Sequence, residues 1–173
     1  MPISETPLIS ETQIARRISE LAEEISTDYA GENLLVLPIL KGGLFFAADL
    51  ARKLTVPLTM DFVRARSYRG TRSLGTVELL VVPTEELRGS HILIIEDILD
   101  TCHTTLSIQE WLLEKEPASI SLAVLLEKRV PHIENVRADY IGFEIENHFV
   151  VGYGLDCDEH YRNLPAIHVF QFE

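Results

Sequence analysis

The chain has 173 residues, of which 46% are hydrophobic and 24% charged, a composition typical of a globular protein with one buried core. Its 15 basic and 27 acidic residues give a net charge of −12, which argues against nonspecific nucleic-acid binding because such binding needs a basic surface. No stretch approaches the roughly 18 apolar residues that cross a bilayer, and the N-terminus lacks the basic start and apolar core of a signal peptide. We therefore expect a single cytoplasmic domain over residues 1–173, without membrane or nucleic-acid partners.

The first predicted element is an amphipathic helix over about residues 11–29. Ser10 and Gln13 have the spacing of a capping box, in which each side chain satisfies the backbone N–H of the other residue. Apolar residues then recur at helical spacing, and Gly31 marks the exit of the helix. The next apolar run, residues 34–39, predicts a buried strand.

A tight turn, Leu40-Lys41-Gly42-Gly43, connects this strand to a second helical pattern. The glycines permit close approach of the backbone to a ligand, and the lysine supplies positive charge, as in turns that bind anions. An ordinary turn between a strand and a helix is the alternative. The turn by itself does not decide between the two interpretations.

An arginine-rich segment, residues 64–75, follows a strand predicted at residues 57–63. The segment contains four arginines and no acid in an otherwise acidic chain, and its glycines and serines are typical of a segment that moves. Residues 76–82 predict the returning strand. The segment is therefore either a loop that closes over a ligand or a solvated hairpin connection.

The most informative stretch is residues 91–106. It begins with a strand apolar enough to be buried on both faces, which Glu96 and Asp97 close, and Asp100 then leads through a threonine-rich loop into a helix. A loop that enters a helix offers free backbone N–H groups to a phosphate, and the adjacent acids can bind a ribose diol or a magnesium-bound diol. The alternative is a plain turn in which Asp100 or a threonine caps the helix and the two acids are solvated.

Residues 119–126 predict another buried strand, with Lys128 at its exit, after a helix that ends near Glu116. Strands that alternate with helices imply a parallel α/β sheet. Ligands bind beyond the carboxyl ends of the strands in such sheets, and Lys41, Asp100 and Lys128 each fall at one of these ends. The sequence therefore predicts that these three side chains meet at one site.

The central stretch resembles the phosphoribosyl pyrophosphate signature of the type I phosphoribosyltransferases, which is an apolar strand, two acids, two further residues, and Asp-Thr-Gly before a threonine-containing turn. Here it stands as Ile94-Ile95-Glu96-Asp97-Ile98-Leu99-Asp100-Thr101-Cys102-His103-Thr104. Cys102 occupies the place where the family most often has glycine, and its Cβ constrains how closely the backbone approaches a phosphate. Cys102 is either a tolerated small residue or an oxidisable thiol, and we expect no disulfide with Cys157.

The resemblance extends from the first helix to the last strand. Residues 166–170 predict the last strand, and the segment between Phe149 and Pro165 is similar to the hood of the hypoxanthine-guanine phosphoribosyltransferases. The resemblance implies the type I phosphoribosyltransferase fold, a mostly parallel α/β sheet flanked by helices, with a small hood formed by the N-terminal segment and about residues 140–173. It also implies a strained or cis peptide before Lys41.

The same resemblance implies a purine salvage enzyme. Such an enzyme uses Mg²⁺ to transfer the phosphoribosyl group from phosphoribosyl pyrophosphate to hypoxanthine and guanine, giving IMP or GMP and pyrophosphate, and it forms a homodimer or homotetramer. A xanthine-preferring enzyme of the same fold is one alternative. The other is a non-enzymatic regulator that senses phosphoribosyl pyrophosphate, which would be expected to show a basic face or an added helix-turn-helix.

Roles for single residues are likewise implied by the resemblance. Asp100 is the catalytic base or acid that faces N7 of the purine, and the remaining candidates surround it. They are Glu96, Asp97, Thr101, Cys102, His103 and Thr104 for the ribose and 5′-phosphate; Lys128, Phe149, Val150 and Asp156 for the purine; Lys41, Gly42, Ser67, Tyr68 and Arg162 for pyrophosphate and the closing loop; and Glu96, Asp97 and Asp156 for magnesium.

Overall fold

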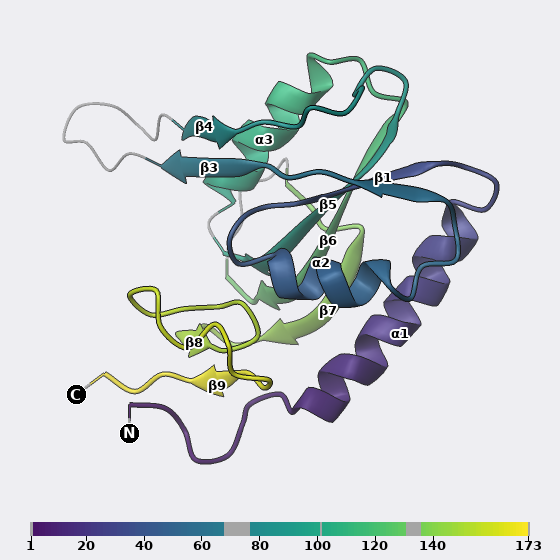
Figure 1. Ribbon diagram of the computed structural model, residues 1–173. Coiled ribbons are helices and arrows are strands. Elements are labelled where there is room, and N and C mark those ends of the chain that lie inside the picture. Colours follow the sequence, from purple (N-terminus) through teal and green to yellow (C-terminus); the bar gives the residue numbers. More distant parts are fainter. Residues whose placement is uncertain (1, 68–76, 101, 131–135, 173) are drawn as a thin grey trace.

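The computed structural model describes residues 2–67, 77–100, 102–130 and 136–172 (Figure 1). At its centre is a five-stranded sheet in the order β2-β1-β5-β6-β7, in which every neighbouring pair is parallel. This is the parallel α/β sheet that the alternation of strands and helices predicts. Its strands are β1 (Leu34–Pro38), β2 (Leu58–Met60), β5 (His91–Leu99), β6 (Ser119–Lys128) and β7 (Tyr140–Ile145).

Helices cover both faces of the sheet, so the inner strands are apolar on both sides. On one face, α1 (Glu11–Asp28) and α2 (Leu44–Ala51) pack in a core that includes Val36 of β1. On the other face, α3 (His103–Leu113) packs in a second core that includes Leu35. Because successive strand residues point to opposite faces, this alternation explains the near-continuous apolar runs of the strands.

The helix α1 begins at the predicted capping box and covers one edge of the sheet. Gln13 N donates to Ser10 Oγ at 3.3 Å, and Ser10 N donates to Gln13 Oε1 at 2.9 Å. Farther along, Arg17 donates to the backbone carbonyls of Ile141 and Gly142 on β7, at 2.8 and 3.0 Å. These bonds occupy backbone acceptors of an edge strand, which would otherwise be open to pairing with another chain.

An antiparallel hairpin of β3 (Arg64–Ser67) and β4 (Val77–Val81) lies beside α3 (Figure 1). The arginine-rich segment, predicted as a loop from residue 64, therefore begins as a strand. The reason is that residues 64–67 find pairing partners in the returning strand. The rest of the predicted closing segment, residues 68–76, lies outside the described residues.

The two chain ends form a small layer next to the sheet, which we call the hood (residues 2–9 and 149–170). In it, β8 (Val150–Val151) and β9 (His168–Val169) pair antiparallel. The N-terminal segment joins them through bridges from Ile3 to Phe170 and from Ile9 to Ile167. The prediction of a hood from both chain ends is confirmed, but residues 140–145 belong to the central sheet as β7.

Several predicted boundaries are wrong by a few residues. The strand β5 does not close at Glu96 and Asp97 but continues to Leu99, because β6 goes on pairing with it as far as Glu127. The third helix ends at Leu113 and not near residue 116. The strand predicted at 57–63 shortens to β2, and the one at 119–126 extends to 128. No helix in the described part of the chain is both long and apolar enough to cross a membrane.

Candidate active site

The acid pair, Glu96 and Asp97, lies near the carboxyl end of β5, the central strand of the sheet. Asp97 Oδ1 accepts a hydrogen bond from Ile98 N at 2.8 Å, and Glu96 Oε1 accepts one from Asp97 N at 3.2 Å. Burial and then the charge of Asp97 raise the pKa of Glu96 well above its usual range, and burial also raises the pKa of Asp97. One buried and one partly buried carboxyl group thus lie next to each other, and a nearby cation would stabilise their ionised forms.

The turn that follows β1 lies directly against this acid pair. A Cβ on Gly42 would lie 1.7 Å from Asp97 Oδ2, so only glycine allows the carboxylate to approach the turn so closely. A Cβ on Gly154 of the hood would lie 2.3 Å from the Gly42 carbonyl oxygen, and Gly154 has a φ of 103°. The Leu40–Lys41 peptide is cis, as the resemblance implies. Hood, turn and acid pair are therefore in close contact.

Asp100 and Lys128 meet at the carboxyl ends of neighbouring strands. Lys128 Nζ donates to Asp100 Oδ2 at 2.8 Å. The lysine side chain is only 10% exposed, whereas the aspartate side chain is 45% exposed. The pair thus offers one buried cation and one accessible carboxylate to a ligand. Lys41 was predicted to meet them, but its ammonium instead pairs with a hood residue described below.

The loop between β5 and α3 has an unusual backbone at Cys102. This residue is the N-cap of α3 with a φ of 67°, and its side chain does not cap the helix, so neither Asp100 nor a threonine is the cap. Cys102 is 5% exposed, and its thiol donates to the Asp100 carbonyl at 3.3 Å. The first two helical residues are His103, which is exposed, and Thr104, which is partly buried. Thr101 lies outside the described residues.

Phe149 immediately precedes the hood strand β8 and is 42% exposed, which is high for a phenylalanine. Its ring contacts Phe170 and Phe172 edge-on, with centroid separations of 5.7 and 5.1 Å. Val150 next to it is buried and pairs with Val169. The cluster therefore supports the Phe149 ring from the hood while leaving part of it accessible for stacking.

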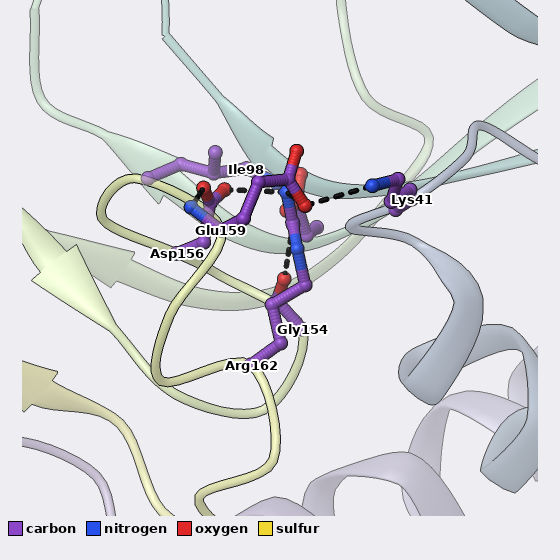
Figure 2. A network of polar contacts seen from close by, with 7 residues as sticks. Lys41, Ile98, Gly154, Asp156, Glu159 and Arg162 are labelled. Atoms are coloured by element: carbon purple, nitrogen blue, oxygen red, sulfur yellow. Dashed lines mark hydrogen bonds and ion pairs between the residues drawn. The ribbon is translucent and has the colours of Figure 1, made fainter.

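A network of charged groups joins the hood loop 154–162 to the turn that follows β1 (Figure 2). Arg162 donates to Gly154 O and to Asp156 Oδ1, both at 2.7 Å. Glu159 Oε2 lies 2.8 Å from Lys41 Nζ and 3.5 Å from Arg162 Nη2, so one carboxylate contacts both cations. The Lys41 hydrogen bond and the charge of Arg162 keep the pKa of Glu159 below its usual value.

The two closing-loop candidates are placed differently by the structure. Ser67 is the last residue of β3 and pairs with Val77 of β4. Tyr68 lies outside the described residues. The described part of the predicted closing segment, residues 64–67, therefore lies in the hairpin beside α3, on the same side of the sheet as the loop at Cys102.

A divalent cation fits part of the predicted magnesium set. Among the described residues, no three His, Cys, Asp or Glu side chains gather as a ready metal cluster. The donor chemistry of Glu96 and Asp97 nevertheless fits Mg²⁺, because buried carboxyl groups with raised pKa values are stabilised by a nearby positive charge. Asp156 is less available to bind a metal ion, since its Oδ1 pairs with Arg162 and its Oδ2 accepts a hydrogen bond from Glu159 N at 2.9 Å.

Two residues of the site were not singled out from the sequence. Glu159 lies in an acidic run with Asp156 and Asp158, which by itself is typical of a solvated surface. Gly154 forms a glycine pair with Gly152, a pattern that could have indicated close approach of two backbone segments. The contact between hood and turn involves both missed residues.

Comparisons with known proteins agree with this geometry. A family model for the phosphoribosyl transferase domain matches residues 8–158. The hypoxanthine-guanine phosphoribosyltransferase of Streptococcus pneumoniae is 40% identical over 167 residues, which covers 96% of this chain and 93% of that protein. The protein of the same name from Lactococcus lactis is 42% identical over 170 residues, covering 98% and 92%.

Solved structures extend the similarity to the fold. A hypoxanthine-guanine phosphoribosyltransferase from Bacillus anthracis superimposes with a TM-score of 0.91 at 36% identity, covering 98% of this chain and 99% of that one. A hypoxanthine phosphoribosyltransferase from Staphylococcus aureus gives a TM-score of 0.92 at 37% identity, covering 96% and 91%. The similarity therefore includes the central sheet and the hood together.

Proposed function

The chain belongs to the phosphoribosyl transferase family, and we propose that it is a purine salvage enzyme whose substrates are phosphoribosyl pyrophosphate and a 6-oxopurine base. In the proposed reaction, N9 of hypoxanthine or guanine forms a bond to C1′ of the ribose while the bond from C1′ to the pyrophosphate oxygen breaks. The products are IMP or GMP and pyrophosphate. The observation that carries this proposal is the Asp100–Lys128 pair beside the buried acid pair at the carboxyl end of the sheet.

The purine is proposed to bind between the sheet and the hood. Lys128 would donate to O6, since its buried ammonium already points at an acceptor. Asp100 would exchange a proton with N7, which requires the accessible carboxylate that the structure provides. Phe149 would stack on the ring, and the Val150 backbone would meet the edge of the base. A 6-oxopurine fits this set because lysine can only donate, and O6 can accept.

The ribose and its 5′-phosphate are proposed to bind along β5 and the N-terminus of α3. Glu96 and Asp97 would contact the ribose hydroxyls, directly or through Mg²⁺. The 5′-phosphate would lie at the N-terminus of the helix, where free N–H groups and the helix dipole favour an anion. The groups proposed for this cradle are Thr101, Cys102, His103 and Thr104.

Pyrophosphate is proposed to bind between the turn that follows β1 and the hood. Lys41, Arg162 and the backbone at Gly42 would contact it, and Asp156 would join Glu96 and Asp97 in binding magnesium. Bound Mg²⁺ would neutralise charge that develops on the departing pyrophosphate. Ser67 and Tyr68 would close over the substrate and exclude water.

No nucleophilic side chain is needed in this scheme. A transition state with oxocarbenium character is stabilised by positioning and by neutralisation of the leaving group. The chain's own part is therefore to orient the base on Lys128 and Phe149, to move a proton at Asp100, and to neutralise pyrophosphate with Lys41 and Arg162.

A panel of bases tests the proposal. Hypoxanthine, guanine, xanthine and adenine are each incubated with phosphoribosyl pyrophosphate and Mg²⁺, and nucleotide formation is followed with and without a chelator. Turnover on hypoxanthine or guanine that the chelator abolishes is the expected result. Preference for xanthine would support the alternative enzyme, and binding of phosphoribosyl pyrophosphate without turnover on any base would support a regulator.

Two further properties stay predictions. A homodimer or homotetramer is expected from the family, and light scattering on the purified protein would measure the mass in solution. A cytoplasmic location is expected from the composition, and cell fractionation would test it.

A further inference from the structure

Glu159 occupies the space between two cations that the proposed function assigns to pyrophosphate. Its Oε2 lies 2.8 Å from Lys41 Nζ and 3.5 Å from Arg162 Nη2 (Figure 2). The same oxygen thus bridges the turn that follows β1 and the hood loop. A single carboxylate between two cations is the arrangement that a phosphate oxygen would adopt in this subsite.

The backbone conformation around Glu159 determines where its side chain begins. Asp158 and Glu159 have φ angles of 51° and 65°, in the left-handed region that L residues rarely adopt. The Glu159 N–H donates to Asp156 Oδ2 at 2.9 Å, which fixes the turn. Strained residues of this kind persist where the surrounding structure requires them, and they cluster at functional sites.

Arg162 has capacity for a further acceptor. Its side chain is 20% exposed, and Nε is buried without a hydrogen-bond partner among the described residues. Its other nitrogens contact Gly154 O, Asp156 and, at a long 3.5 Å, Glu159. The hood loop thus leaves one guanidinium N–H, at the buried Nε, unsatisfied, and the long Nη2 contact with Glu159 is the one that a phosphate oxygen would replace.

We propose that Glu159 is an internal competitor of pyrophosphate: its carboxylate occupies the Lys41–Arg162 subsite in the free enzyme, is displaced by phosphoribosyl pyrophosphate, and returns as pyrophosphate leaves. The inference rests on the proposed function, because it takes its ligand from that reaction. The Glu159 side chain is 62% exposed, so it can swing into solvent without leaving a buried charge. Its return would keep the two cations paired and so favour product release.

The test compares two variants that each remove one negative charge. Glu159→Gln keeps the size of the side chain and removes the charge. Glu20→Gln is the matched control, because Glu20 also bridges two cations, Arg16 and Arg17, at 3.0 and 3.1 Å, but on α1. Thermal melting is expected within about 2 °C of the wild type for both, as for surface substitutions of this kind.

Steady-state kinetics and calorimetry of pyrophosphate binding then measure the competition. For Glu159→Gln we expect the KM for phosphoribosyl pyrophosphate and the inhibition constant of pyrophosphate to fall about 3- to 10-fold, the range for two exposed ion pairs. The KM for hypoxanthine should not change, and Glu20→Gln should match the wild type. High salt should shrink the difference, because the effect is electrostatic.

The other outcomes separate the two proposals. An unchanged KM for phosphoribosyl pyrophosphate in Glu159→Gln would overturn the inference. A higher KM would also overturn it, because it would show that Glu159 holds the two cations in place for the ligand. A wild type that turns over no base would overturn the proposed function. Calorimetry with pyrophosphate would then still support the competitor role if Glu159→Gln bound it more tightly, and would end that role if the two affinities were equal.

Discussion

The two ends of the candidate site, which we propose bind the base and pyrophosphate, differ in how their lysines are fixed. At the base end, Lys128 lies at the end of a strand, is 10% exposed, and pairs with Asp100 on the neighbouring strand. At the pyrophosphate end, Lys41 lies in a turn, is 46% exposed, and pairs with Glu159 in a hood loop. The first pair is built into the sheet, whereas the second joins two separate parts of the chain.

This difference matches what each end is proposed to do. A base must be distinguished from similar bases, which requires donors and acceptors in fixed positions. Pyrophosphate arrives as part of one substrate and departs as a product, so its subsite must bind and release. We therefore expect substitutions at the base end to change chemistry and base affinity, and substitutions at the other end to change the kinetics of phosphoribosyl pyrophosphate and pyrophosphate.

The largest effect should come from Asp100→Asn at the base end. Loss of the proton-transfer group should lower kcat on the order of 10²-fold or more, while the amide keeps the shape of the side chain. Steady-state kinetics with hypoxanthine measures this. Asp61→Asn is a control, because Asp61 accepts hydrogen bonds from Phe62, Thr84 and Glu85 and touches neither lysine. Undiminished turnover in Asp100→Asn would remove Asp100 from the mechanism.

Gly154→Ala should break the contact between hood and turn. The new Cβ meets the Gly42 carbonyl at 2.3 Å, and the residue must adopt a φ of 103°, so we expect a loss of about 2 kcal/mol in the free energy of unfolding. Gly31→Ala is the matched control, with a φ of 90° and nothing within 4 Å of the added Cβ. Urea unfolding compares them. Equal losses in the two variants would mean that the close contact contributes nothing.

The paired variants Lys128→Met and Lys41→Met test whether the two ends are separate. Each loss of a charged hydrogen bond, worth about 1.5 kcal/mol, should raise one KM by about 10-fold. The KM for hypoxanthine should rise in Lys128→Met, and the KM for phosphoribosyl pyrophosphate in Lys41→Met. If both variants raised both constants equally, the division of the site would be wrong.

The smallest expected effect is at Asp61, which gives a reference carboxylate outside both ends. Burial alone would raise its pKa, but the N–H groups of Thr84, Phe62 and Glu85 and the Thr84 hydroxyl lower it below the usual value. A lowered pKa in the folded state stabilises the protein above the unfolded pKa, and this contribution is lost as the pH falls through the folded value.

Urea unfolding at neutral pH and near pH 3 measures this contribution. The wild type should exceed Asp61→Asn by under about 1 kcal/mol at neutral pH, since the group is only partly buried, and the difference should shrink in acid. A difference that grew as the pH fell would contradict the assignment.

Local patterns in the sequence were sufficient for the inner strands of the central sheet and for the acid pair, Glu96 and Asp97, but not for β7, which was assigned to the hood. The capping box at Ser10 and the apolar runs of β1, β5 and β6 follow from spacing and side-chain type alone. The boundaries were less accurate because pairing across the sheet decides where a strand ends, as the continuation of β5 to Leu99 illustrates. Cys102 shows the same limit, since a φ of 67° is a property of the folded loop.

The contact between the hood loop and the turn that follows β1 could not be predicted in this way, although the meeting of Asp100 and Lys128 was. Lys41 and Glu159 are 118 positions apart, and no local pattern indicates that they meet. The acidic run around Glu159 is ordinary surface by composition, and it becomes part of the site only because the hood returns to the turn that follows β1. The family resemblance supplied the roles, but it did not supply this pairing.

The placement of the acid pair on β5 has a consequence for how the molecule opens. This strand is paired on both sides, with β1 and β6, and Ile92 to Ile95 are fully buried. Amide hydrogens of such a strand exchange with solvent only when most of the domain unfolds, whereas a loop such as residues 156–162 exchanges through local fluctuations. Ligand entry and exit should therefore occur by local opening of the hood loop, while the acids remain in the most slowly exchanging part of the chain.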